Sequence, residues 1–100
     1  MSTNKDMLDA LERAGVSREL VSHPIPGGSF RVEREDLDRE LVFEEEMYYF
    51  ERGPRFRWRW DIWERWSPDH NQRWAFREGS RERDVAGMVA RVVDFLGEET

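Results

Sequence analysis

The stretch Arg55-Phe-Arg-Trp-Arg-Trp-Asp-Ile62 decides the fold, because charged and apolar side chains alternate along it without a fault. Successive side chains of a β-strand point to opposite faces of a sheet, so this pattern predicts a strand with one apolar and one charged face. Phe, Trp and Ile also favour strands by residue type. A sheet with one apolar face needs a covering layer, and the neighbouring segments must supply it.

A second strand is predicted upstream of this stretch. The Glu content of residues 35–52 would suit a helix, but their apolar residues scatter around a helical circumference and gather better at period two. We therefore predict a strand from Glu40 to Glu51, joined to Arg55–Ile62 by a Gly53-Pro54 turn in an antiparallel hairpin. With Arg52 and Arg55 flanking the turn, four pairs follow: Tyr49 with Trp58, Met47 with Trp60, Phe50 with Arg57, and Tyr48 with Arg59.

The N-terminal third predicts one helix and two short strands. Met7, Leu8 and Leu11 give the segment from Asn4 to Ala14 one apolar face, and Gly15 follows where a left-handed residue favours a helix stop. Short strands are expected near Leu20–Ser22 and Phe30–Glu33, on either side of a Pro- and Gly-rich turn.

The C-terminal third completes an α+β domain. The alternation fails at residues 63–66, which indicates a bulge or a strand end, and residues 67–71 have turn chemistry. A further strand is expected from Arg73 to Glu78, and then a helix from Arg81 to Leu96 with Ser80 as its cap. The predicted fold is an N-terminal helix, an antiparallel sheet of four to five strands, and a C-terminal helix packed on one sheet face.

Length and composition set the broad class. One hundred residues, 38% of them apolar, suit one domain covering residues 1–100. The chain has no Cys, which excludes disulfides and thiolate sites and fits a reducing compartment. No apolar run approaches the ~20 residues of a membrane span, and the charged N-terminus is not a signal peptide. We expect a cytoplasmic protein that does not contact membranes.

Charge is distributed unevenly along the chain. Residues 31–46 hold eight acidic and three basic side chains, whereas residues 52–83 hold nine basic and five acidic ones. The whole chain has a formal net charge of −6. An anionic partner is therefore conceivable for the central segment even though the protein as a whole is acidic.

Two binding hypotheses follow from the Arg- and aromatic-rich segment. Interleaved Arg and aromatic residues can stack bases and neutralise phosphates in single-stranded nucleic acid. Alternation, however, places the rings on one face and the arginines on the other, where they can pair with neighbouring acids such as Glu44 and Glu46. Five Trp residues are also many for a small core, so either all five fill the core or some of them are exposed and form a protein interface.

Catalytic and metal chemistry have little support in the sequence. His70 lies near Asp61, Asp69, Glu64, Arg65 and Arg73, a set that a small ribonuclease could use, but the spacing is not diagnostic. His23 and His70 are far apart and form no zinc motif, and no phosphate-binding loop or cofactor motif is present. We predict no catalytic residues, no metal site and no cofactor.

The preferred hypothesis is a non-enzymatic protein-binding or regulatory module that acts through an aromatic and Arg-rich sheet surface, with self-association as one form of it. An RNA or single-stranded nucleic-acid binder is the alternative, and a ribonuclease-type enzyme comes third. The predicted binding residues are Tyr48, Phe50, Arg55, Arg57, Arg59, Trp63, Arg65, Trp66 and Arg73.

Overall fold

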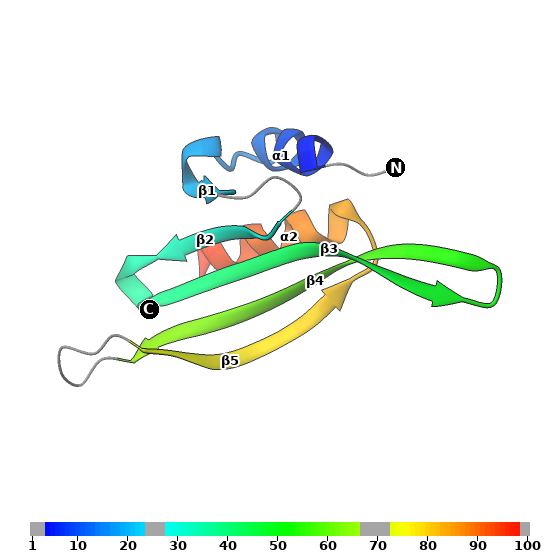
Figure 1. The fold of residues 1–100 in the computed structure, drawn as a ribbon. Helices are drawn as coiled ribbons and strands as arrows, with labels where there is room; N and C mark the ends of the chain where they lie inside the picture. The colour runs from blue at the N-terminus through cyan, green and yellow to red at the C-terminus, as the bar shows by residue number, and fades with distance from the viewer. Residues whose placement is uncertain (1–3, 24–27, 67–72, 99–100) are drawn as a thin grey trace.

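The structure, a computed structural model, describes residues 4–23, 28–66 and 73–98. Its centre is a sheet of five antiparallel strands, in which each strand lies beside the next one along the chain (Figure 1). Two helices, two short 3₁₀ helices and the strands follow in the order α1 (Asn4–Arg13), η1 (Arg18–Leu20), β1 (Val21–Ser22), β2 (Phe30–Arg34), η2 (Glu35–Leu37), β3 (Arg39–Phe50), β4 (Gly53–Trp66), β5 (Arg73–Glu82) and α2 (Val85–Gly97). The predicted α+β fold is confirmed.

The core lies between the sheet and the two helices, which cover the same face of it (Figure 1). The rings that alternate with arginines on β4 point into this core: Trp58 is 2% exposed and Trp60 is 7% exposed. The indole of Trp60 is not left unsatisfied, because its Nε1–H donates to Glu82 Oε1 at 3.3 Å. The other buried side chains are Met7, Leu11, Val16, Phe30, Val32, Leu41, Phe43, Ile62, Met88, Val92 and Phe95.

The ends of the helices are fixed by local hydrogen bonds. After α1, Gly15 has a φ of 92° and the Val16 amide donates to the Leu11 carbonyl at 2.9 Å, which confirms the predicted helix stop. At the far end of α2, the Arg34 guanidinium donates to the carbonyls of Phe95 and Leu96, both at 3.2 Å. This contact satisfies terminal carbonyls and ties β2 to α2. No helix in the described residues is long and apolar enough to cross a membrane.

The predicted boundary between the last strand and the last helix was wrong. The backbone of β5 continues to pair with β4 as far as Glu82, opposite Trp58, so residues 79–82 belong to the sheet. The helix begins at Val85, and its cap is Asp84, whose carboxylate accepts from the Gly87 amide at 2.8 Å. Ser80 is therefore a strand residue, because cross-strand pairing outweighs its preference for a cap.

Beyond Ile62 the structure has a bulge and not a strand end. β4 runs on to Trp66, and the register shifts between Ile62 and Trp63. Ile62 pairs with Glu78 and Trp63 pairs with Phe76, so the extra residue is Arg77 on β5. The predicted turn at residues 67–71 lies outside the described residues.

The hairpin register was also wrong, although the face of each side chain was right. Glu45, not Tyr49, lies opposite Trp58, a difference of four residues. The reason is the turn: Glu51 and Arg52 alone connect the strands, and Gly53 opens β4 with a φ of 115° that favours glycine. Because a shift by an even number of residues preserves the alternation, the predicted apolar and charged faces hold.

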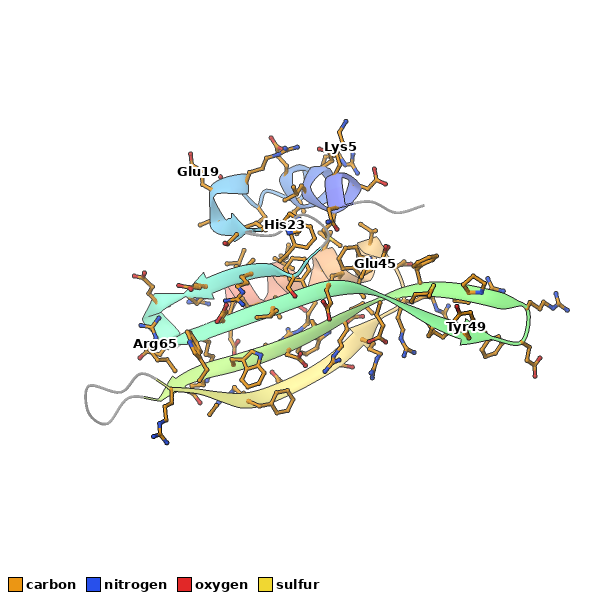
Figure 2. All side chains as sticks on the ribbon, in the orientation of Figure 1. Lys5, Glu19, His23, Glu45, Tyr49 and Arg65 are labelled. Atoms are coloured by element: carbon orange, nitrogen blue, oxygen red, sulfur yellow. The ribbon has the colours of Figure 1, made fainter. Side chains whose placement is uncertain are left out.

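Residues 45–57, which we call the arm, project beyond the rest of the sheet (Figure 1). β2 ends its pairing at Phe43 and β5 ends at Trp58, so within the described residues this part of the hairpin has two strands only. Figure 2 shows Glu45 where the arm leaves the sheet and Tyr49 far along it. Four large apolar side chains of the arm are exposed: Met47, Tyr49, Phe50 and Phe56.

Candidate functional site on the open face of the sheet

The side chains that alternate with the core residues form the other side of the sheet, which we call the open face. Neither α1 nor α2 covers it, because their buried residues belong to the core on the opposite side. A shallow depression of about 430 Å³ lies on the open face across strands β2 to β5. Its lining residues are Ser29, Arg31, Glu40, Val42, Glu44, Arg59, Asp61, Trp63 and Trp74.

Three aromatic rings gather at one side of this depression. Trp63 on β4 and Phe76 on β5 are cross-strand partners, and their rings meet edge to face with centroids 5.5 Å apart. Trp74 pairs with Arg65, whose guanidinium carbon lies 5.1 Å from the centre of the indole. The rings are not core: Trp74 is 38% exposed and Phe76 is 58% exposed. We call Trp63, Trp74 and Phe76 the aromatic cluster.

The aromatic cluster forms because the side chains of β4 keep alternating between the two faces, while one residue on the open face is aromatic and not charged. From Arg55 to Arg65, alternate side chains of β4 face the open side, and Trp63 falls in this series where a charged residue would continue the pattern. The bulge at Arg77 then brings Phe76 opposite Trp63. The break in alternation seen in the sequence thus marks a surface aromatic residue.

Asp61 holds its carboxylate over the backbone of β5. It lies opposite Gly79, and a Cβ atom at that glycine would come within 2.5 Å of Asp61 Oδ1 and 3.0 Å of the Trp60 carbonyl oxygen. Glycine is therefore needed here for close approach and not for its backbone freedom. Arg59 Nε forms an ion pair with Asp61 Oδ2 at 3.8 Å, too far for a hydrogen bond.

Glu40 is a buried carboxylate within the same depression. Glu40 is 5% exposed, and its Oε1 atom accepts no hydrogen bond from the described residues. Arg31 Nη1 lies 3.4 Å from that oxygen as an ion pair, while Glu33 is its cross-strand neighbour. Burial raises the pKa of Glu40, the attraction of Arg31 and Arg65 opposes this, and the repulsion of Glu33 adds to it.

One arginine of β4 and one of β5 pair with the same glutamate of β3. Arg57 Nε donates to Glu46 Oε1 at 2.7 Å, and Arg81 Nε donates to the same oxygen at 3.0 Å. These hydrogen bonds lower the pKa of Glu46, and the one from Arg57 contributes most. Arg57 also lies over the Tyr48 ring at 4.2 Å. Part of the charge difference seen along the sequence is therefore balanced by pairing between strands.

The structure divides the predicted binding residues into separate groups. Arg59, Trp63 and Arg65 lie in or beside the depression. Four others lie on the open side of the arm, away from the aromatic cluster: Tyr48, Phe50, Arg55 and Arg57. The backbones of Trp66 and Arg73 pair at the opposite end of β4 and β5, and the side chain of Trp66 is outside the described residues.

The residues proposed for ribonuclease-type catalysis are not gathered by the described part of the fold. Asp61 and Arg65 face the open side, but Glu64 faces the helix side, where it pairs with Arg39 and Arg77. His70 and Asp69 lie outside the described residues. Across residues 4–23, 28–66 and 73–98, no group of His, Asp and Glu side chains is placed to hold a metal ion.

Several residues of the depression and of the aromatic cluster were not predicted from the sequence. Glu40 and Val42 of the depression come from the acidic segment, and Trp74 and Phe76 of the aromatic cluster come from the last strand. One signal did exist, because Trp74 and Phe76 share a face at period two. Their approach to Trp63 depends on the bulge, whose exact position the sequence does not reveal.

Comparisons with known proteins add no relative from which a role could be transferred. No family model matches the chain, and searches of curated proteins and of solved structures find no match. The function must therefore be argued from the residues of the open face themselves.

Proposed function

We propose that this protein is a non-enzymatic binding module that recognises another protein through the open face of its sheet. The observation that carries the proposal is the aromatic cluster, three large rings on a sheet face that no helix of the described chain covers. Exposed rings surrounded by charged residues are typical of protein interfaces, where aromatic and Arg side chains are enriched.

The mixed charge of the open face supports a protein partner over nucleic acid. Carboxylates of Glu40, Glu44 and Asp61 lie among the arginines of the depression. Two further arginines, Arg57 and Arg81, are engaged by Glu46. A nucleic-acid backbone presents a row of phosphates, which these carboxylates would repel. Protein surfaces carry charges of both signs and can match such a pattern.

The test is affinity capture from extracts of the producing cells, followed by reconstitution with the purified candidate partner. We expect Phe76→Ser to weaken binding at least tenfold, because a ring at the centre of an interface is worth ~2 kcal/mol or more. Val93→Ser is the matched control: Val93 is an exposed apolar residue of α2, on the helix side of the molecule. Its substitution should leave binding unchanged.

Two results would overturn the proposal. One is a partner that binds Phe76→Ser and the unaltered chain equally well. The other is tight binding of random single-stranded RNA that falls steeply with salt, which would favour the nucleic-acid hypothesis. Light scattering in the same buffers identifies self-association: a dimer sensitive to Phe76→Ser would make a second copy the partner.

A further inference from the structure

The depression contains a buried carboxylate whose Oε1 atom has an ion pair, with Arg31 Nη1 at 3.4 Å, but no hydrogen bond from the described residues. This carboxylate belongs to Glu40, whose exposed fraction is 5%. Burying a carboxylate with too few hydrogen-bond donors costs stability, because its solvation by water is only partly replaced. Glu40 lines the depression. Because Oε1 itself is buried beside Arg31, a donor entering from outside would hydrogen-bond to Glu40 only after its carboxylate turns toward the opening of the depression.

The walls of the depression suit a planar cation. Trp63 and Trp74 both line it. Two arginines show that guanidinium groups are stable against rings on this side of the sheet: Arg65 lies against Trp74 at 5.1 Å, and on the arm Arg57 lies over Tyr48 at 4.2 Å. A guanidinium is flat, stacks on aromatic rings and carries five N–H donors, whereas an ammonium is a compact point charge.

Charge also favours a cationic occupant. The depression is lined by three carboxylates, those of Glu40, Glu44 and Asp61, and by two guanidiniums, those of Arg31 and Arg59. The chain as a whole has a net charge of −6. The charges of the depression and of Arg65 beside it nearly balance, so it is the overall negative charge that attracts a basic protein surface and disfavours an acidic one.

From these three observations we infer that the depression receives an arginine side chain of the partner protein, stacked on the indoles of Trp63 and Trp74 and hydrogen-bonded to Glu40. This inference rests on the proposed function, since it names the group that the open face recognises. Asp61, held over Gly79, is the second carboxylate within the depression and adds to the attraction.

The experiment uses the full chain and a defined probe, acetyl-Gly-Arg-Gly-amide, titrated at low salt with NMR detection of the indole N–H signals. We expect saturable shifts of the Trp63 and Trp74 signals and none for buried Trp58 and Trp60. The same peptide with citrulline in place of arginine has nearly the same shape but no charge. It should cause no saturable shift, because it lacks the cation that pairs with the carboxylate.

The variant Glu40→Gln tests the carboxylate directly. It should weaken the arginine peptide about tenfold, which is the usual effect of losing a charge-assisted hydrogen bond. Glu64→Gln removes the same charge from the residue next to Trp63, but on the helix side, and should leave the affinity unchanged. Equal shifts with the citrulline peptide, or an unchanged affinity in Glu40→Gln, would overturn the inference. So would the absence of any saturable shift.

Failure of this inference can be told apart from failure of the proposed function. If the reconstituted partner binds Glu40→Gln normally but loses affinity for Phe76→Ser, the open face is an interface and the arginine assignment is wrong. If the partner is indifferent to both substitutions, the open face is not the binding surface. Shifts with the arginine peptide would not restore the inference in that case, because no arginine of the partner would enter the depression.

Discussion

Trp60 and Trp63 lie three residues apart on β4, yet Trp60 is buried in the core and Trp63 lies on the open face. Trp60 is 7% exposed, its indole donates to Glu82, and Arg91 lies over its ring at 4.5 Å. Trp63 faces the other side of the sheet, where its ring meets the edge-strand residue Phe76 and the shallow depression. The comparison teaches that a covering helix, and not the residue type, decides what a ring on this sheet does.

The largest effect should come from removing a ring on the covered face. Trp58 is 2% exposed and its ring lies 6.2 Å from those of Phe30 and Phe43, so Trp58→Ala leaves a large cavity. We expect a loss of ~3–5 kcal/mol in the free energy of unfolding, measured by urea denaturation with circular dichroism. Trp63→Ala on the open face is the matched control, with an expected loss below ~1 kcal/mol. Similar losses for both variants would contradict the distinction between the two faces.

A smaller loss should follow from filling the space under Asp61. In Gly79→Ala the new Cβ would lie 3.0 Å from the Trp60 carbonyl oxygen and closer still to the Asp61 carboxylate, so the two strands must separate or Asp61 must move. We expect ~1–3 kcal/mol of destabilisation by thermal unfolding. Gly97→Ala is the control, because a methyl group at that glycine would have no neighbouring atom within 4 Å. A neutral Gly79→Ala would mean that Asp61 is not held over the backbone.

The difference between the faces also explains which parts of the structure could be predicted from the sequence. The covered face follows from alternation, because Trp58, Trp60 and Ile62 each satisfy the same period-two pattern. The open face does not follow from alternation. Its depression combines Glu40 of the acidic segment with Trp63 of the basic segment, and these two residues are opposite each other only because of the strand register. The predicted register placed Tyr49 and not Glu45 opposite Trp58, so no sequence argument paired the correct residues.

Two carboxylates on the open side of the sheet should respond to pH in opposite directions. Hydrogen bonds from Arg57 and Arg81 lower the pKa of Glu46, so its ionised form stabilises the fold above the unfolded pKa, and this is lost as the pH falls through the folded pKa. Burial raises the pKa of Glu40 against the pull of Arg31 and Arg65, with Glu33 adding to the rise. Its ionised form therefore costs stability at neutral pH, and that cost disappears as the pH falls.

Glu46→Gln and Glu40→Gln sharpen this contrast. At pH 7 we expect Glu46→Gln to lose ~0.5 kcal/mol, a modest figure because the pair is at the surface. Glu40→Gln should instead gain stability, by roughly 2–4 °C in Tm if the gain is ~0.5 kcal/mol. Thermal unfolding between pH 3 and pH 7 checks both, and each difference from the unaltered chain should shrink at low pH. A less stable Glu40→Gln at pH 7 would show that the carboxylate is satisfied within the fold.

The smallest effect is expected on the arm, where the apolar side of β3 runs past the helices. Tyr49 is 78% exposed, so Tyr49→Thr removes a ring that contacts little while keeping a residue that favours strands. The expected change in unfolding free energy is below ~0.5 kcal/mol at low protein concentration. A loss above ~1 kcal/mol that grows with protein concentration would mean that the arm is buried against a second copy. In that case the covered face would extend along the whole hairpin, with a helix covering one half and another molecule covering the other.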